Sequence, residues 1–354
     1  MTTLFDPLTL GDLHIPGRII MAPMTRSRAD DHGRVSSITA TYYAQRAGAG
    51  LIISEGIYPS PMGKGYIRTP GLADDTHVAA WRAVTDAVHA RGGRIFAQIM
   101  HAGRISNPYF LPGGATPVAP SAIRPAGASY TDEGMLPHVT PRALEYDEIP
   151  GIVEEHRRAA ERAIAAGFDG VELHNASGYL MEQFLSSGTN HREDGYGGSI
   201  EGRARLTVEV LSALSEAVGP GRVGIKISPE LGFNDITDAT PAETYSHLAR
   251  AISPLGLAYL HVVHGGTKVD YHALLRPLFD GPYLAGGGFT RESAEALLAR
   301  GGADAIVFGA PFISNPDLPE RFRRRAPLAP ADKSTFYTPG PQGYIDYPAL
   351  DEAA

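Results

Sequence analysis

Eight short apolar runs, each separated from the next by a longer stretch, constrain the fold of this chain most strongly. Their apolar residues are consecutive rather than alternating, which is typical of parallel strands covered by helices on both faces. Right-handed β–α crossovers repeated eight times can close a sheet without leaving an edge. The pattern therefore predicts a (β/α)8 TIM barrel, with a doubly wound open sheet as the alternative. The runs span residues 18–22, 51–55, 94–99, 170–174, 223–228, 259–264, 283–286 and 305–309.

The stretches between the runs have the period and the start signals of helices. In residues 148–166, apolar and small residues recur every three or four positions, which predicts one buried face. Two stretches do not fit the repeat, 106–147 and 332–354, and we expect them to form an excursion after the third strand and a C-terminal tail over the barrel mouth. Since no linker of different composition interrupts the chain, we predict a single domain over residues 1–354. The predicted N-caps are Asp75 or Thr76, Ser199, Thr240 and Thr290.

Composition excludes several classes of function. Thirty-one Lys and Arg against 39 Asp and Glu give a net charge of −8, which disfavours nucleic acids and anionic membranes as partners. The absence of cysteine excludes disulfides, thiolate metal sites and a cysteine nucleophile. His261 and His264 are spaced to face opposite sides of a strand, so we expect no metal. No apolar run reaches the roughly 18 residues of a membrane span, and no leader pattern opens the chain, so we expect a cytoplasmic protein.

The candidate functional residues are those that end the runs, because active sites of such barrels lie at the C-terminal ends of the strands. These ends are unusually polar. Glycines follow the last two runs, and their bare N–H groups, with the helix that starts at Thr290, suit a phosphate. The polar ends are residues 22–26, 54–56, 98–101, 174–179 and 226–229, and the glycines are 286–288 and 309.

Motifs in the same order across nearly the whole chain resemble the old yellow enzyme family of FMN-dependent ene-reductases. Any one of them is weak, but the ordered set is specific. The resemblance implies a barrel with FMN at its mouth, reduced by NADPH or NADH and reoxidised by an activated alkene. The motifs are Met21–Arg26, Gln98 with His101 and Gly103-Arg104, His174 with Gly178-Tyr179-Leu180, Gln183-Phe184-Leu185, residues 191–199, Asn315–Leu318 and Gly343–Pro348.

The resemblance also implies roles for single residues. His174 would bind the carbonyl oxygen of the unsaturated substrate, and Tyr179 would give a proton to the alkene as general acid. Thr25 would bond the flavin C4 carbonyl, Gln98 the pyrimidine edge, and Lys226 would lie near N1 and the C2 carbonyl. Further implied cofactor contacts are Pro23, Met24, Gly56, Gly287, Gly288, Gly309 and Ala310, and further implied substrate contacts are Ser177, Tyr66 and Tyr344.

This sequence departs from the family pattern at several of these positions. Ser177 stands where the family has His or Asn, and Lys226 where it has Arg. Ala310 replaces the arginine that binds the FMN phosphate, a loss of roughly 1.5 to 3 kcal/mol that we expect Arg291 to offset.

Two further positions distinguish this chain within the family. Met100 replaces a common tryptophan, and Thr25 places the chain in the branch without the redox-tuning cysteine.

Two alternative functions remain open from the sequence. Lys226, in a barrel strand, is compatible with a Schiff-base lyase that needs no flavin. Ser177 and Ala310 are compatible with a member that binds FMN weakly and acts as a redox-neutral isomerase or as a binding scaffold. The sequence leaves the natural alkene, the preferred nicotinamide nucleotide and the choice between monomer and homodimer open.

Overall fold

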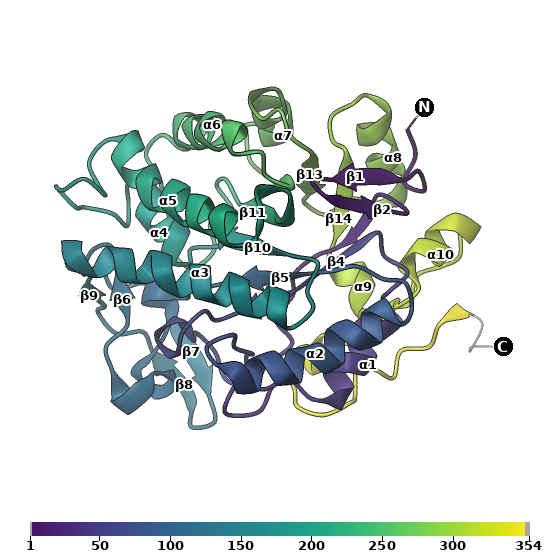
Figure 1. Ribbon diagram of the computed structural model, residues 1–354, viewed down its shortest axis with the longest axis horizontal. Helices are drawn as coiled ribbons and strands as arrows, with labels where there is room; N and C mark the ends of the chain where they lie inside the picture. Colours follow the sequence, from purple (N-terminus) through teal and green to yellow (C-terminus); the bar gives the residue numbers. More distant parts are fainter. Residues whose placement is uncertain (1, 351–354) are drawn as a thin grey trace.

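Eight parallel strands close into a barrel within residues 2–350, the part of the chain that the computed structural model describes (Figure 1). Consecutive strands pair in order, and the last pairs with the first, so the barrel prediction is confirmed and the open-sheet alternative is wrong. The strands follow the predicted runs to within two residues. They are β3 (Ile19–Met21), β4 (Leu51–Ile57), β5 (Ile95–Ile99), β10 (Gly170–Asn175), β11 (Val223–Ile227), β12 (Tyr259–Val263), β13 (Tyr283–Gly286) and β14 (Ala305–Phe308).

Helices cover the outside of the barrel between successive strands (Figure 1). The N-caps Ser199 and Thr290 are confirmed, since the side chain of each accepts a hydrogen bond from its first helical turn. The cap of α2 is Asp74 rather than Asp75 or Thr76, and Thr240 begins α6 without a side-chain bond. The helices are α1 (Ser37–Gln45), α2 (Asp75–His89), α3 (Ile149–Ala165), α4 (Leu180–Leu185), α5 (Ile200–Val218), α6 (Pro241–Ile252), α7 (Tyr271–Leu275), α8 (Arg291–Ala299), α9 (Ala310–Ser314) and α10 (Leu318–Arg324).

An antiparallel hairpin closes the N-terminal end of the barrel. It consists of β1 (Leu8–Leu10) and β2 (Leu13–Ile15), and the side chains of Leu10 and Ile15 pack with inward-facing residues such as Phe96 and Tyr259 in one buried cluster. This apolar cluster fills the N-terminal end of the barrel interior. The barrel is therefore open only at the C-terminal ends of its strands.

The predicted excursion follows β5 and lies beside the barrel mouth. It contains two small sheets, β6 (Val118–Ala119) with β9 (Arg142–Ala143), and the hairpin β7 (Ala128–Thr131) with β8 (Gly134–Pro137). Residues of the β7–β8 hairpin line a cavity at the mouth.

Two buried arginines after β3 hold the C-terminal tail over the mouth. Arg26 donates to the carbonyl of Gly343 at 2.8 Å, and Arg28 donates to those of Thr335 and Gln342, both at 2.9 Å. The predicted position of the tail is thereby confirmed as far as residue 350, while 351–354 lie outside the described residues.

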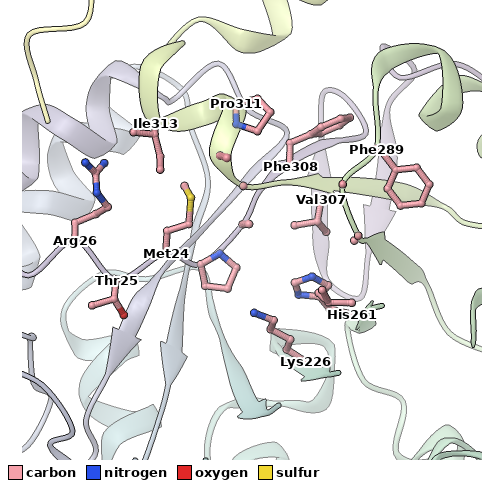
Figure 2. A pocket seen from close by; sticks show the side chains of 18 of the residues that line it. Met24, Thr25, Arg26, Lys226, His261, Phe289, Val307, Phe308, Pro311 and Ile313 are labelled. Atoms are coloured by element: carbon pink, nitrogen blue, oxygen red, sulfur yellow. The ribbon is translucent and has the colours of Figure 1, made fainter. Parts of the chain in front are cut away.

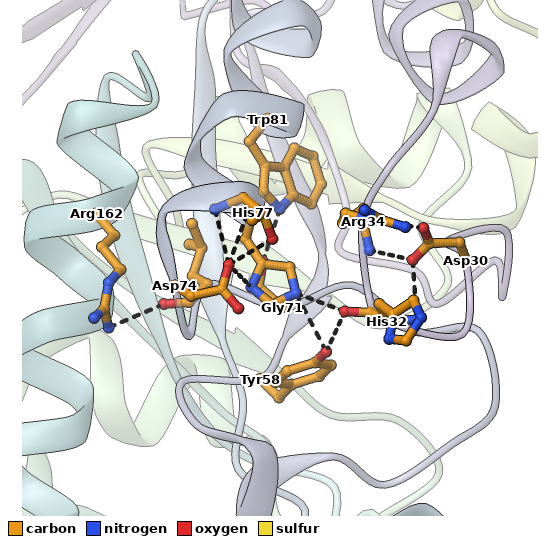
Figure 3. A network of polar contacts seen from close by, with 11 residues as sticks. Asp30, His32, Arg34, Tyr58, Gly71, Asp74, His77, Trp81 and Arg162 are labelled. Carbon is orange, nitrogen blue, oxygen red and sulfur yellow. Dashed lines mark hydrogen bonds and ion pairs between the residues drawn. The ribbon is translucent and has the colours of Figure 1, made fainter.

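A polar network fastens the long loop between β3 and α1 to α2 (Figure 3). The ring of His77, in α2, approaches the carbonyl oxygen of His32 at 2.8 Å with Nε2, and Tyr58 donates to the same oxygen at 3.2 Å. The Asp74 carboxylate lies 3.2 Å from the other ring nitrogen of His77. The segment 25–28 belongs to the same loop, so these hydrogen bonds to α2 also restrict its position.

Candidate active site

Two adjoining cavities open at the C-terminal ends of the strands. The first, of about 550 Å³, extends from β3 to β13 and β14 (Figure 2), and the second, of about 440 Å³, lies over β4, β5 and β10. Four residues line both cavities, so the two form one groove along the mouth. These shared residues are Pro23, Thr25, Lys226 and Tyr337.

One end of the first cavity is a cradle of backbone N–H groups. Gly287 and Gly288 have φ values of +139° and +79°, and a Cβ at Gly287 would lie 2.0 Å from the carbonyl oxygen of His264, so this turn requires glycine. Among the described residues, the N–H groups of Gly287, Gly288 and Gly309 have no hydrogen-bond acceptor. Unsatisfied backbone donors of this kind suit an anion such as a phosphate.

The expectation that Arg291 replaces the missing arginine at Ala310 is wrong. Its side chain is bonded to Glu295 at 2.9 Å and to the carbonyl of Phe322 at 2.5 Å, and it lines a neighbouring cavity rather than the first one. Arg26 does line the first cavity, but the residue is only 1% exposed and its guanidinium is bonded to the tail and to Tyr42.

A layer of polar side chains forms the floor where the cavities meet. Gln98 Nε2 donates to Glu172 at 2.7 Å, and His261 Nδ1 donates to the other oxygen of Glu172 at 3.0 Å. Lys226 lies in register between His174 and His261 on the neighbouring strands, and Figure 2 shows Lys226 and His261 pointing into the same cavity. Burial lowers the pKa of Lys226, and the nearby carboxylates of Glu172 and Glu182 oppose that shift. Within residues 2–350, the ammonium makes no hydrogen bond and no ion pair within 4 Å.

The second cavity brings together the residues predicted for acid–base chemistry. The phenol oxygens of Tyr66 and Tyr179 lie 2.8 Å apart, and the rings of His174 and Tyr179 meet edge to face at 4.9 Å between centroids. Burial raises the pKa of Tyr179 well above its ordinary value, so this phenol keeps its proton at neutral pH. Burial and the charge of Lys226 hold the pKa of His174 well below its usual range, so this imidazole is neutral.

The remaining predicted residues of this cavity are placed by irregular backbone. Ser177 has a left-handed φ of +57°, and its N–H donates to Ser228 Oγ at 2.7 Å. Gly56 follows a register shift in β4, and a Cβ there would lie 2.7 Å from Met100 Sδ, so glycine and methionine share this wall of the cavity.

The expectation that Tyr344 lines the substrate pocket is wrong. Its ring is fully buried, stacks on Tyr42 at a centroid distance of 4.1 Å and lies under the Arg28 guanidinium at 4.4 Å. Tyr337, from the same tail, lines both cavities instead. Arg26 and Arg28 bind the tail so that residue 344 is drawn inward and residue 337 faces the groove.

Sequence reasoning missed the apolar rim of the second cavity. Its members are large side chains, each more than half exposed, from three segments far apart in the chain. Their sequence signal was the presence of large apolar residues in segments outside the strand-and-helix repeat of the barrel, but their convergence depends on the fold. They are Tyr130, Met135, Phe233 and Tyr337.

Two expected absences concern the described residues alone. Within residues 2–350, no group of three or more His, Asp or Glu side chains is arranged to hold a metal ion. No described helix is both long and apolar enough to span a membrane.

A closed barrel with an anion cradle, a buried cation and a protonated phenol along its mouth defines an enzyme that binds a phosphorylated cofactor beside its substrate. Comparison with known families is more specific. The model of the NADH:flavin oxidoreductase / NADH oxidase family matches residues 3–328. The chain therefore belongs to this family, the old yellow enzyme family, and is an FMN-dependent oxidoreductase that takes electrons from a reduced nicotinamide nucleotide and reduces activated alkenes.

Individual relatives cover nearly the whole chain. 12-Oxophytodienoate reductase 1 of Oryza sativa subsp. japonica is 42% identical over 99% of this chain and 93% of its own length. Morphinone reductase in complex with tetrahydroNAD is 47% identical, with a TM-score of 0.95 over 100% of this chain and 99% of the other. The old yellow enzyme homologue from Zymomonas mobilis is 41% identical, with a TM-score of 0.96 over 99% of this chain and 100% of the other.

The residues present fit FMN. The unpartnered N–H groups of Gly287, Gly288 and Gly309 suit its phosphate. The free ammonium of Lys226 and the buried amide of Gln98 suit the polar edge of its ring.

Proposed function

We propose that the protein reduces the carbon–carbon double bond of enones and related activated alkenes, with His174 binding the acceptor oxygen and Tyr179 supplying the proton. FMN, when bound, supplies the hydride that reaches the β carbon. The single observation that carries the proposal is the placement of a neutral imidazole and a protonated phenol in contact over one cavity.

His174 acts as a hydrogen-bond donor to the substrate carbonyl. A neutral imidazole carries one N–H, and such a bond draws electron density from the conjugated alkene. Ser177 lines the same cavity, but its hydroxyl is short, so we propose that His174 provides most of this polarisation.

Tyr179 donates its hydroxyl proton to the α carbon. A phenol with a raised pKa holds its proton until a strongly basic carbon develops beside it. The Tyr66 hydroxyl, 2.8 Å away, orients that of Tyr179 and can hydrogen-bond the phenolate after transfer.

For cofactor binding, we propose the residues predicted from the sequence, in three groups. Pro23, Met24, Thr25 and Gly56 lie along the ring, and Thr25 assigns the chain to the branch without the tuning cysteine. Gln98 and Lys226 meet the pyrimidine edge, and Gly287, Gly288, Gly309 and Ala310 meet the phosphate. In this arrangement residues 1–354 form one FMN-binding domain.

The apolar rim favours a large acceptor. Exposed aromatic and thioether side chains at a cavity entrance bind apolar groups that extend beyond the reacting centre. Two relatives are named as reductases of morphinone and of 12-oxophytodienoate. We therefore propose multi-ring or long-chain enones as better substrates than 2-cyclohexenone itself.

Reduction of 2-cyclohexenone in deuterated water tests this assignment. The product is expected to carry solvent deuterium at the α carbon, from the exchangeable hydroxyl of Tyr179, and none at the β carbon. A redox-neutral isomerase would form no saturated ketone. A Lys226 Schiff-base lyase would be trapped on the carbonyl substrate by borohydride, which we do not expect.

A further inference from the structure

The floor of the groove holds a buried carboxylate that the proposed reaction does not use. Glu172 lies in β10, two residues before His174, and is fully buried inside the barrel. Because side chains alternate along a strand, Glu172 and His174 point to the same inward face. Its partner in the register on β5 is Gln98.

Both oxygens of Glu172 are occupied by residues that line the cavities. Gln98 Nε2 donates to Oε1 at 2.7 Å, and His261 Nδ1 donates to Oε2 at 3.0 Å. A carboxylate only accepts, so these bonds determine the orientation of both partners. The amide oxygen of Gln98 and the Nε2 lone pair of His261 are therefore turned away from Glu172.

The atoms turned away lack partners of their own. His261 Nε2 is buried and has no hydrogen-bond partner among residues 2–350, although the residue lines the larger cavity. Lys226 lies on the strand beside His261, in register with it. Its ammonium is a hydrogen-bond donor between two acceptors, the amide oxygen of Gln98 and Nε2 of His261. The negative charge of Glu172 balances this cation below the groove.

We propose that Glu172 is a positioning residue. It determines which atoms of Gln98 and His261 face the FMN site, and therefore that these atoms accept hydrogen bonds rather than donate them. By accepting one N–H of Gln98 and the Nδ1–H of His261, it turns the Gln98 amide oxygen and His261 Nε2 toward the cofactor, with the Lys226 ammonium between them. The pyrimidine edge of a flavin carries one N–H, and the ribityl chain carries hydroxyls, so both acceptors meet matching donors. The inference rests on the FMN placement proposed above.

Glu172→Gln tests this role because it keeps the size of the side chain while removing its charge and adding a donor. The new amide can donate to Gln98 Oε1 and turn that amide over. We expect FMN, and also lumiflavin, which has the ring without the ribityl chain, to bind at least about tenfold more weakly. We also expect the midpoint potential of bound flavin to rise, because a negative charge below the ring is lost. Glu172→Asp keeps the carboxylate and is expected to restore the wild-type potential in part.

His261→Asn separates the second acceptor from the first. The asparagine amide can replace Nδ1 as the donor to Glu172 but has no atom in the place of Nε2. We expect weaker binding of FMN and riboflavin with unchanged binding of lumiflavin.

The contrary outcomes are distinct. If E172Q melts at a lower temperature but keeps the wild-type flavin affinity and potential, Glu172 is structural only, and the inference is wrong. If E172Q does not fold, the H261N variant decides. Equal losses of affinity for FMN and lumiflavin, or no loss of affinity for either, would overturn the inference. A wild-type protein that binds no FMN would instead contradict the FMN placement on which the inference rests.

Discussion

The hydroxyls of Tyr66 and Tyr179 are 2.8 Å apart over the cavity that also contains His174. One residue comes from the loop after β4 and the other from the segment between β10 and α4, so the contact exists only in the folded barrel. It places the acid of the proposed reaction beside a second phenol that can orient it.

Tyr179→Phe should slow reoxidation of the reduced enzyme by an enone by roughly 10²–10⁴-fold, the usual contribution of a general acid. Reduction of the flavin by the nicotinamide nucleotide needs no proton from Tyr179 and should keep its rate. Stopped-flow measurement of the two half-reactions checks this. Tyr66→Phe is the matched control and should slow only reoxidation, by a smaller factor. Equal loss in both half-reactions of Y179F would refute the role.

Ser177→Asn should improve binding of the enone about fivefold, because a longer side chain adds a neutral hydrogen bond of about 1 kcal/mol to the carbonyl. Asparagine tolerates the left-handed φ of +57° at this position, so no loss of stability is expected. The KM for 2-cyclohexenone measures the effect. Ser177→Ala is the control, and a large rise in its KM would show that the native hydroxyl already reaches the substrate.

Ala310→Arg should tighten FMN binding by about ten- to a hundredfold, since a charge-assisted hydrogen bond contributes about 1.5–3 kcal/mol. Riboflavin, which lacks the phosphate, should bind unchanged. Titration of flavin fluorescence with apoprotein gives both affinities. A parallel gain for riboflavin would place the new cation away from the phosphate cradle.

Arg28→Met should release the tail, because Arg28 donates to the carbonyls of Thr335, Phe336, Gly340 and Gln342. We expect destabilisation of at least about 2 kcal/mol and faster proteolysis within residues 335–347. Chemical unfolding and limited proteolysis measure the two effects. Arg323→Met is the control: it removes an exposed ion pair with Glu320 and a ring contact with Phe5, and should cost less than about 1 kcal/mol without faster cleavage of the tail.

Stability should fall as pH rises from about 4.5 to 7, in part through Glu182. Burial raises the pKa of this carboxyl from 4.5 to about 7, so the unfolded chain loses its proton first and is favoured as pH increases. Below pH 4.5 the Glu182 carboxyl is protonated in both the folded and the unfolded state. Above pH 7 the folded state bears the full free-energy cost of burying the ionised carboxylate, about 3 kcal/mol. Unfolding of Glu182→Gln at pH 5 and pH 8 should show a smaller difference than the wild type. An unchanged difference would place the titration elsewhere.

The barrel was predictable because its strands are buried on both faces and appear as uninterrupted apolar runs. The positions of His174, Gln98 and Lys226 followed from the rule that the ends of parallel strands meet at one edge, whereas Tyr179, in the segment after β10, followed from the family motif. The placement of the three strand residues does not depend on the paths of the loops.

The errors come from segments whose positions depend on distant contacts. Tyr337 and Tyr344 are both tyrosines of the C-terminal tail, so the sequence does not distinguish them. The hydrogen bonds from Arg26 and Arg28 to the tail determine which of the two faces the groove. The proximity of Arg291 to the glycines in sequence gave no sign of its bond to Glu295. Glu172 could have been noticed as a charged residue in an apolar run, at an even spacing from His174.

The visible spectrum of the purified protein, followed anaerobically, tests the central claim most directly. We predict a yellow protein with bound FMN that bleaches on addition of NADPH or NADH and regains its colour when 2-cyclohexenone or a maleimide is added. A colourless protein that does not bind added FMN, or a bleached one that no activated alkene reoxidises, would contradict the account.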